Sequence, residues 1–170
     1  ILIVPSLLLA IWAQMMVSSN FKKYSAVYNQ RGYTGADAAR MILDSNGLYH
    51  VRIERVSGNL TDHYDPKDEV IRLSDSVYGS ASVAAVGVAA HEAGHAVQHA
   101  TGYIPIKVRS AIIPITQIGS QLSIPLILMG FLFQFQPLVF AGILFYATAA
   151  LFQLVTLPVE FNASARAMKV

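Results

Sequence analysis

Two histidines and a glutamate near the middle of the chain have the types and spacing of a metal-dependent hydrolytic site. His91, Glu92 and His95 form the pattern His-Glu-x-x-His. On a helix, residues four apart lie about 40° apart in azimuth and about 6 Å apart along the axis, so both imidazoles can reach one zinc ion. Glu92 points about 100° round from His91, where it can take a proton from a water. The pattern therefore predicts a zinc site with Glu92 as the general base.

The surroundings of this pattern favour a functional site over coincidence. Residues 82–100 are apolar on nearly every face, and their ionisable groups are His91, Glu92, His95 and His99. A helix without a polar face is buried, and an unpaired charge there costs several kcal/mol. The alternative, histidines satisfied by local hydrogen bonds, would bury three polar groups for no gain. The triple arises by chance in roughly one such chain in 300.

A catalytic zinc usually takes three protein ligands and keeps a fourth position for water. Thr101 stands where the metzincin pattern would place a third histidine. His99 lies about 12 Å along the helix from His91, which favours a hydrogen-bonded or interfacial histidine. Glu160 is the remaining candidate, and it follows Pro158 at what we expect to be the first turn of a new helix. A carboxylate that caps a helix start is the alternative interpretation of Glu160.

Three apolar segments predict a membrane protein. The chain is 54% apolar and 13% charged, against about 25% charged residues in ordinary soluble chains. A membrane-spanning helix needs about 20 residues, with about 17 as the lower limit. We expect an anchor at residues 1–17, a proline-kinked span at 109–135 and a further span at 138–159, followed by a helix start at 160–170. A signal peptide is the alternative for the first segment, but it lacks a basic n-region and an Ala-x-Ala site.

The distribution of basic residues predicts the orientation of these spans. Ten bases lie between the first and second spans, none lies in the turn at residues 134–137, and two follow the third span. The polar domain and the C-terminal end should therefore face the cytoplasm of a multi-pass cell (inner) membrane protein. Two crossings return the chain to the side that it left. Glu160 should thus emerge on the same face as His91 and His95, which predicts a His₂Glu zinc site.

The polar domain at residues 18–108 predicts an α+β fold. Thr34 and Asp37 form a capping box that opens a helix. Alternating segments then predict three strands of a small antiparallel meander, which precedes the His-Glu-x-x-His helix. An exposed edge of this sheet could hold an extended peptide. The predicted strands are residues 50–56, 60–64 and 69–73.

Composition excludes several other classes of protein. A net charge of +2 without a basic stripe argues against nucleic acid as a partner. The absence of cysteine excludes disulfides and cysteine-based zinc sites. The predicted spans hold no charged residue between their ends, which argues against an ion-conducting bundle. The chain starts without methionine and stops within a helical pattern, so we expect sequence beyond both ends.

Three stretches resemble the putative neutral zinc metallopeptidases of bacterial membranes (YugP-like), and the resemblance runs over essentially the whole chain. They are LTDHYDP at residues 60–66, VGVAAHEAGHAVQH at 86–99 and LVTLPVEFNAS at 154–164. The layout is more distantly similar to the gluzincins of the HtpX and CAAX-protease type, and by that analogy Glu160 is the third ligand. In those relatives an aspartate four residues after the glutamate orients a metal-bound histidine, whereas this chain has Ser164 there.

These observations predict hydrolysis of peptide bonds in peptide or membrane-protein substrates. His63, Tyr64 and Arg166 are candidates for a donor to the oxyanion of the reaction, and Asn162 or Ser164 is the candidate that orients a histidine. The alternative is a membrane protein that cuts no peptide and whose zinc is structural or regulatory. A closed four-ligand site with His99 or His63 as the fourth ligand would favour that alternative.

Overall fold

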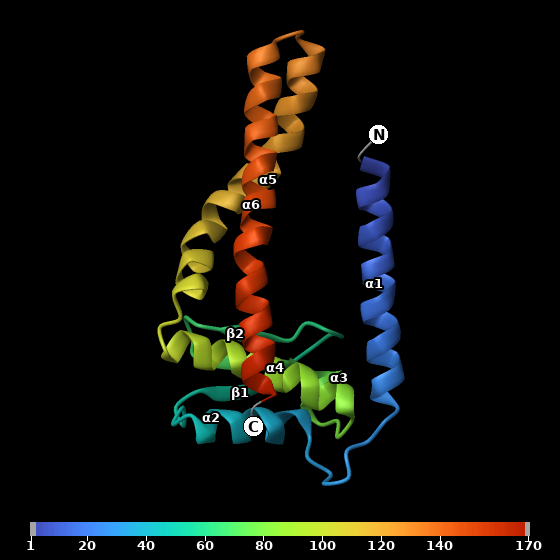
Figure 1. The fold of residues 1–170 in the computed structure, drawn as a ribbon, viewed down its shortest axis with the longest axis vertical. Helices are drawn as coiled ribbons and strands as arrows, with labels where there is room; N and C mark the ends of the chain where they lie inside the picture. The colour runs from blue at the N-terminus through green and yellow to red at the C-terminus, as the bar shows by residue number, and fades with distance from the viewer. Residues whose placement is uncertain (1–2, 169–170) are drawn as a thin grey trace. The chain divides into compact units, whose positions relative to one another are not determined.

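The structure, a computed structural model, describes residues 3–168, with the backbone alone described for residues 3–7. The chain divides into two compact units. The first comprises residues 1–97 and 164–170, and the second comprises residues 98–163. The order of the elements along the chain can be followed in Figure 1, and two helices, α4 and α6, contribute residues to both units.

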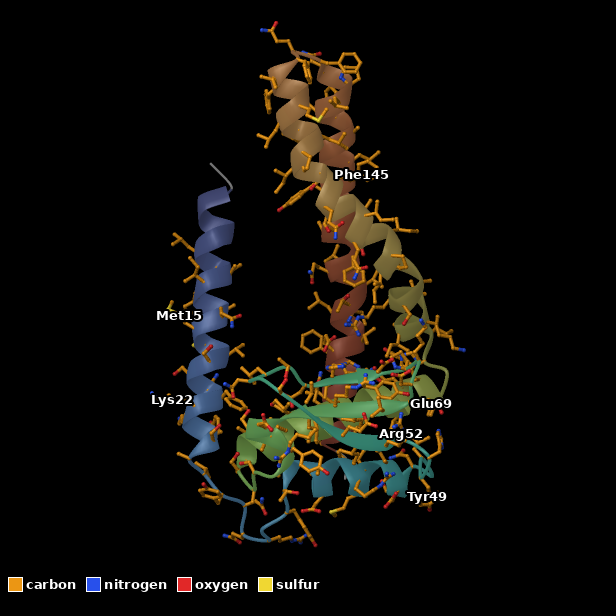
Figure 2. All side chains as sticks on the ribbon, turned by 180° about the vertical axis from the view of Figure 1, so that it is seen from behind. Met15, Lys22, Tyr49, Arg52, Glu69 and Phe145 are labelled. Atoms are coloured by element: carbon orange, nitrogen blue, oxygen red, sulfur yellow. The ribbon has the colours of Figure 1, made fainter. Side chains whose placement is uncertain are left out.

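The first unit holds the small sheet and most of the helices. Its elements are α1 (Ile3–Ser25), α2 (Gly35–Ser45), β1 (Arg52–Val56), β2 (His63–Asp65), β3 (Val70–Ser74), α3 (Asp75–Tyr78) and most of α4 (Val83–Ala100). The predicted anchor at residues 1–17 lies within α1, although its first two residues lie outside the described part of the chain. The helix continues beyond the apolar segment into a basic last turn, a change that can be followed from Met15 to Lys22 (Figure 2).

The capping box at the start of α2 is confirmed. The Thr34 side chain accepts a hydrogen bond from the backbone N–H of Asp37 over 3.2 Å. The Asp37 carboxylate in turn accepts one from the backbone N–H of Thr34 over 2.9 Å. Two donors that the first helical turn leaves without partners are thereby satisfied, which fixes where the helix begins.

The prediction of an antiparallel meander is wrong. The strand order is β1-β3-β2, and β1 pairs with β3 in parallel, while β2 pairs with β3 in antiparallel orientation. The alternation of side chains reveals a strand but neither its partner nor its direction. The second strand is also shorter than predicted, because Leu60 has a positive φ of 55° and lies outside β2.

The central position of β3 explains why it is the most buried strand. Val70, Ile71 and Leu73 are each 0% exposed. Ile71 and Leu73 belong to one core with residues from α2 and α4, including Leu43 and Ala89. The core thus anchors α4, the helix that carries His91, against the sheet.

The second unit contains the long helices α5 (Ile104–Leu132) and most of α6 (Gln136–Ala167). Within residues 3–168, these two helices are long and apolar enough to cross a membrane. They correspond to the predicted spans at residues 109–135 and 138–159, with shifted ends. The bend of α5 is visible in Figure 1, and Pro114 and Pro125 lie inside this helix.

The expectation that Pro158 starts a new helix is wrong, because α6 runs through it without interruption. A proline inside a helix removes one backbone donor, and proline is more frequent in transmembrane helices than in soluble ones. Glu160 therefore lies inside a long helix, and the interpretation of Glu160 as a helix-start cap is excluded.

Candidate metal centre

His91 and His95 lie side by side on α4, as their spacing predicts. Their ring centroids are 4.7 Å apart with the ring planes at 85°, and a ligand nitrogen from each lies within 4.8 Å of the other. The His95 residue is 8% exposed, and His91 is half-buried. Two imidazoles at this separation can converge on one metal ion.

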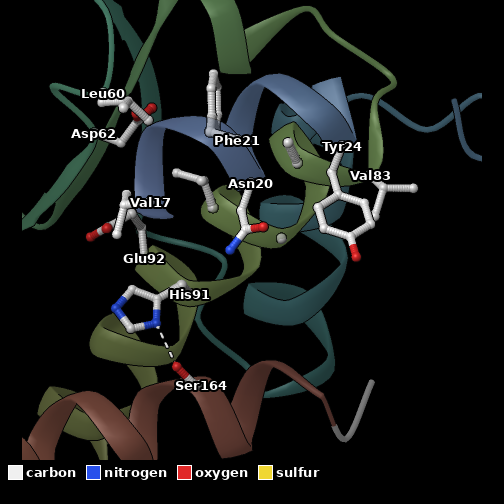
Figure 3. A pocket seen from close by; sticks show the side chains of 13 residues that line it. Val17, Asn20, Phe21, Tyr24, Leu60, Asp62, Val83, His91, Glu92 and Ser164 are labelled. Carbon is white, nitrogen blue, oxygen red and sulfur yellow. Dashed lines mark hydrogen bonds between the residues drawn. The ribbon is translucent and has the colours of Figure 1, made fainter. Parts of the chain in front are cut away.

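The ring of His91 is held by a residue that lies far away in the sequence. Nδ1 of His91 lies 3.1 Å from Oγ of Ser164, which belongs to the last turns of α6 and to the same unit (Figure 3). A hydrogen bond at one ring nitrogen fixes the tautomer and the ring orientation, and so decides which nitrogen can act as a metal ligand. The contact with Ser164 leaves Nε2 as the nitrogen of His91 suited to that role.

The carboxylate of Glu92 is held by the edge strand β2. The backbone N–H of Tyr64 donates to Oε2 of Glu92 over 3.0 Å. Burial raises the pKa of Glu92 above its usual value, while His95, His91 and the Tyr64 N–H act in the opposite direction. A carboxyl with a raised pKa is a better match for proton transfer near neutral pH.

The strand that holds Glu92 is itself fixed from both ends. Before β2, the Asp62 carboxylate accepts bonds from the backbone N–H of Ser74 over 2.7 Å and from its hydroxyl over 3.0 Å. After Tyr64, the Arg72 guanidinium donates to Asp65 over 2.8 Å and to Asp68 over 2.7 Å. The Arg72 guanidinium holds the pKa of Asp65 below its usual range, with help from the backbone N–H of Lys67. These bonds fix the position of the Tyr64 amide.

The structural importance of Asp62 was not predicted from the sequence. Its carboxylate accepts a hydrogen bond from the backbone N–H of Ser74 in the neighbouring strand. Asp62 also lines the same cavity as Glu92. The available signal was a short polar side chain directly before a strand, a position where aspartate often bonds the backbone.

The other predicted residues occupy different environments. The His63 ring lies 2.8 Å from the carbonyl of Thr61 in its own loop, and the ring of Tyr64 packs against the core. Arg166 lies in the last turn of α6. In the second unit, Oε1 of Glu160 lies 3.7 Å from a guanidinium nitrogen of Arg109.

The remaining two predicted residues, His99 and Asn162, also belong to the second unit. His99 lies in the last turn of α4 and is half-buried. Asn162 accepts a bond from Gln98 over 3.1 Å, and Gln98 also donates to the carbonyl of Val159 over 2.8 Å. Asn162 thus supports the packing of its own unit, and a shared metal site that includes Glu160 stays a prediction.

A cavity of about 580 Å³ opens beside α4. His91 and Glu92 line one end of it, together with Ser164 and Asp62 (Figure 3). Its volume falls within the range of about 300–1,000 Å³ that is typical of ligand pockets. The cavity is therefore large enough to hold a ligand beside Glu92.

Comparison with known proteins assigns this arrangement to a class. The model of a family described as "Putative neutral zinc metallopeptidase" matches residues 1–170. The chain belongs to this family, and zinc is its cofactor.

A relative in Bacillus subtilis (strain 168) is named "Putative membrane protease YugP". It is 48% identical over 169 residues, which cover 99% of this chain and 75% of the relative. No solved structure matches the chain. The predicted resemblance to the family is thereby confirmed, and the relative's name together with α5 and α6 supports a membrane location.

Proposed function

We propose that the protein is a membrane-bound zinc metalloendopeptidase in which Glu92 is the general base. The observation that carries this proposal is the bond from the Tyr64 N–H to Glu92, directly beside the paired rings of His91 and His95. A structural zinc site has no need for a carboxylate held next to its ligands by a separate strand. A hydrolytic site needs such a carboxylate to remove a proton from water.

We further propose that Glu160 completes the ligand set. His91 and His95 each offer a ring nitrogen, and Glu160 offers a carboxylate oxygen, which together form a donor set typical of catalytic zinc. Glu160 precedes Ser164 by four residues in α6, and residues four apart share one face of a helix. Since Ser164 contacts His91, that face is the one suited to supply the third ligand.

The chemistry divides between the metal and the side chains. Zinc, when bound, supplies an activated water and polarises the scissile carbonyl. The Glu92 carboxylate accepts a proton as the oxygen of the water bonds to the carbonyl carbon, and it then returns the proton to the amide nitrogen as the C–N bond breaks. The Tyr64 N–H keeps the carboxylate in place, and Ser164 keeps the His91 ring in one orientation.

The membrane topology is a further part of the proposal. We propose that α1, α5 and α6 cross the cell membrane and that the first unit faces the cytoplasm, because the basic residues lie between α1 and α5. Since the chain contains no cysteine, single cysteines can report the topology. A cysteine at Lys67 should resist an impermeant maleimide in intact cells, and one at Gln134 should react with it.

Replacing Glu92 by glutamine tests the catalytic role directly. The variant should keep its zinc and should lose about 10²–10⁴-fold in hydrolysis of peptides, the usual contribution of a general base. Glu69→Gln, which changes an exposed carboxylate outside the proposed ligand set, is the matched control and should keep full activity. Unchanged hydrolysis by the Glu92→Gln variant would refute the role.

A further inference from the structure

The cavity beside Glu92 is a groove between α1 and α4, which we call the α1–α4 groove. The α1 residues that line the groove recur every three or four positions, so they lie on one face of this helix. The α4 residues that line the groove recur every four positions, and the last of them are His91 and Glu92. The α1 wall comprises Val17, Asn20, Phe21 and Tyr24, and the α4 wall comprises Val83, Ala84, Gly87, Val88, His91 and Glu92.

The groove changes in character along its length. Val17 lies beside Glu92 at one end, and Tyr24 lies beside Val83 at the other (Figure 3). The polar end holds the reactive groups, whereas the opposite end is built mainly from apolar side chains. Several of these remain open to solvent, with Tyr24 44% and Val83 42% exposed. From Val83 to Glu92 the helix rises about 13 Å, which matches roughly four residues of an extended peptide.

Gly87 lines the groove, one helical turn before His91. A glycine in a helix interior costs about 0.8–1.0 kcal/mol relative to alanine, so a packing reason is normally expected. Such a reason is missing at Gly87, because a Cβ added there would have nothing within 4 Å. The added atom would instead project into the groove. The absence of a side chain at Gly87 therefore keeps the groove open at this position.

The charges around the groove select against an anionic occupant. Asp62 and Glu92 lie at its polar end, and the described residues that line it include no lysine or arginine. Towards the N-terminal end, the same face of α1 continues with the exposed, apolar residues Ala13 and Ala10. An uncharged apolar segment that arrives along α1 would bury this surface, and burial of apolar area is the main source of affinity available there.

We propose that the α1–α4 groove binds an apolar stretch of the peptide substrate, about four residues long, and that Gly87 determines which side chains fit. This inference rests on the proposed function and adds to it the class of substrate. Gly87 acts here as a specificity-determining residue, because a larger residue at this position would occupy the space that the substrate needs.

Reversible blocking of the groove tests the proposal without a change in fold. Gly87→Cys in the Glu92→Gln form of the 170-residue chain, reconstituted in nanodiscs with zinc, provides a single thiol because these residues include no cysteine. The thiol is modified with methyl or benzyl methanethiosulfonate. The probe is a fluorescein-labelled peptide with four central leucines, compared with analogues that carry four alanines or four aspartates, and binding is measured by anisotropy. Lys67→Cys, modified in the same way at an exposed turn, is the matched control.

The leucine peptide should bind more tightly than the alanine peptide, and the aspartate peptide should bind most weakly. The benzyl adduct at Gly87→Cys should weaken binding of the leucine peptide at least about tenfold, within the range expected for groups that fill an apolar pocket. The methyl adduct should have a smaller effect, reduction should restore affinity, and the benzyl adduct at Lys67→Cys should change nothing. Equal binding of all three peptides, no binding of the leucine peptide, or an unchanged affinity after benzylation at Gly87→Cys would overturn the proposal.

Hydrolysis is read separately, with quenched-fluorescent versions of the same peptides and the chain that retains Glu92. Binding that is blocked at Gly87→Cys without any hydrolysis would contradict the proposed function and leave the groove assignment standing. Hydrolysis that is indifferent to the benzyl adduct would contradict the groove assignment and leave the proposed function standing.

Discussion

The backbone amide of Tyr64 donates a hydrogen bond to the carboxylate of Glu92 over 3.0 Å, although the two residues are 28 positions apart in the sequence. The edge strand β2 and the helix α4 are therefore joined at the residue to which we assign proton transfer. Because Asp62 and Arg72 hold β2 at either side of Tyr64, the carboxylate is positioned by the sheet as well as by its own helix.

Removal of the Tyr64 amide donor should impair hydrolysis. Tyr64→Pro lacks the N–H that holds Glu92, and the loss of one hydrogen bond to a charged group should lower kcat by about 10–100-fold with zinc retained. Tyr64→Ala is the control, because it loses the packed ring but keeps the N–H. Kinetics and zinc content of both variants, measured after a check of their melting temperatures, isolate the contribution of the amide. Equal kcat values for the two variants would count against this role.

Ser164 should act as a positioning residue for His91. Ser164→Ala should weaken zinc binding or activity by about 10–100-fold, the usual effect of losing a partner that orients a metal-bound histidine. Ser164→Asp should restore or increase zinc affinity, since a carboxylate makes a stronger bond to the imidazole N–H. Zinc affinity is measured by competition with a fluorescent chelator. Ser120→Ala is the control, because the Ser120 hydroxyl bonds a carbonyl of its own helix, and this variant should bind zinc normally.

The capping box of α2 should make stability depend on pH in acid. The hydroxyl and backbone N–H of Thr34 hold the pKa of Asp37 below its usual value. This stabilisation is complete above the unfolded-state pKa of about 3.9 and is lost as the pH falls through the lower pKa of the folded state. The free energy of unfolding of Asp37→Asn should therefore be about 1 kcal/mol lower at pH 7 than that of the parent chain. It should also fall less between pH 7 and pH 3. Denaturant unfolding followed by circular dichroism, in detergent at pH 7 and pH 3, measures the difference. An equal dependence on pH in both chains would contradict it.

Two glycines should respond to alanine in opposite directions. At Gly142, an added Cβ would lie 2.7 Å from the carbonyl oxygen of Ser123, so Gly142→Ala should destabilise the packing of α5 against α6. At Gly87 the space is open, so Gly87→Ala should stabilise α4 by up to about 1 kcal/mol. Thermal unfolding of the two variants in the same detergent compares them directly. A lower melting temperature for Gly87→Ala than for the parent chain would contradict the open space around Gly87.

Local chemistry made part of this structure predictable. The capping box identified the start of α2 because both of its bonds form between residues three apart. The pairing of His91 with His95 also follows from helix periodicity alone. These features depend on contacts within a few residues, which a sequence pattern records directly.

Contacts between distant residues were not predictable in the same way. The parallel pairing of β1 with β3 depends on which strand occupies the centre, and side-chain alternation is the same for either direction. Pro158 was expected at a helix start, but the surrounding turns of α6 accommodate it. The bond between the Tyr64 amide and Glu92 involves a backbone group, which every residue except proline carries, so the sequence held no signal for it.

The most direct test of the central claim is zinc K-edge X-ray absorption on the purified, zinc-loaded chain. We predict a zinc ion with two imidazoles, one carboxylate and one exchangeable oxygen, and we predict that Glu160→Gln changes this spectrum while Glu69→Gln does not. Four protein ligands with no exchangeable oxygen, or a spectrum unaffected by Glu160→Gln, would contradict a catalytic His₂Glu site.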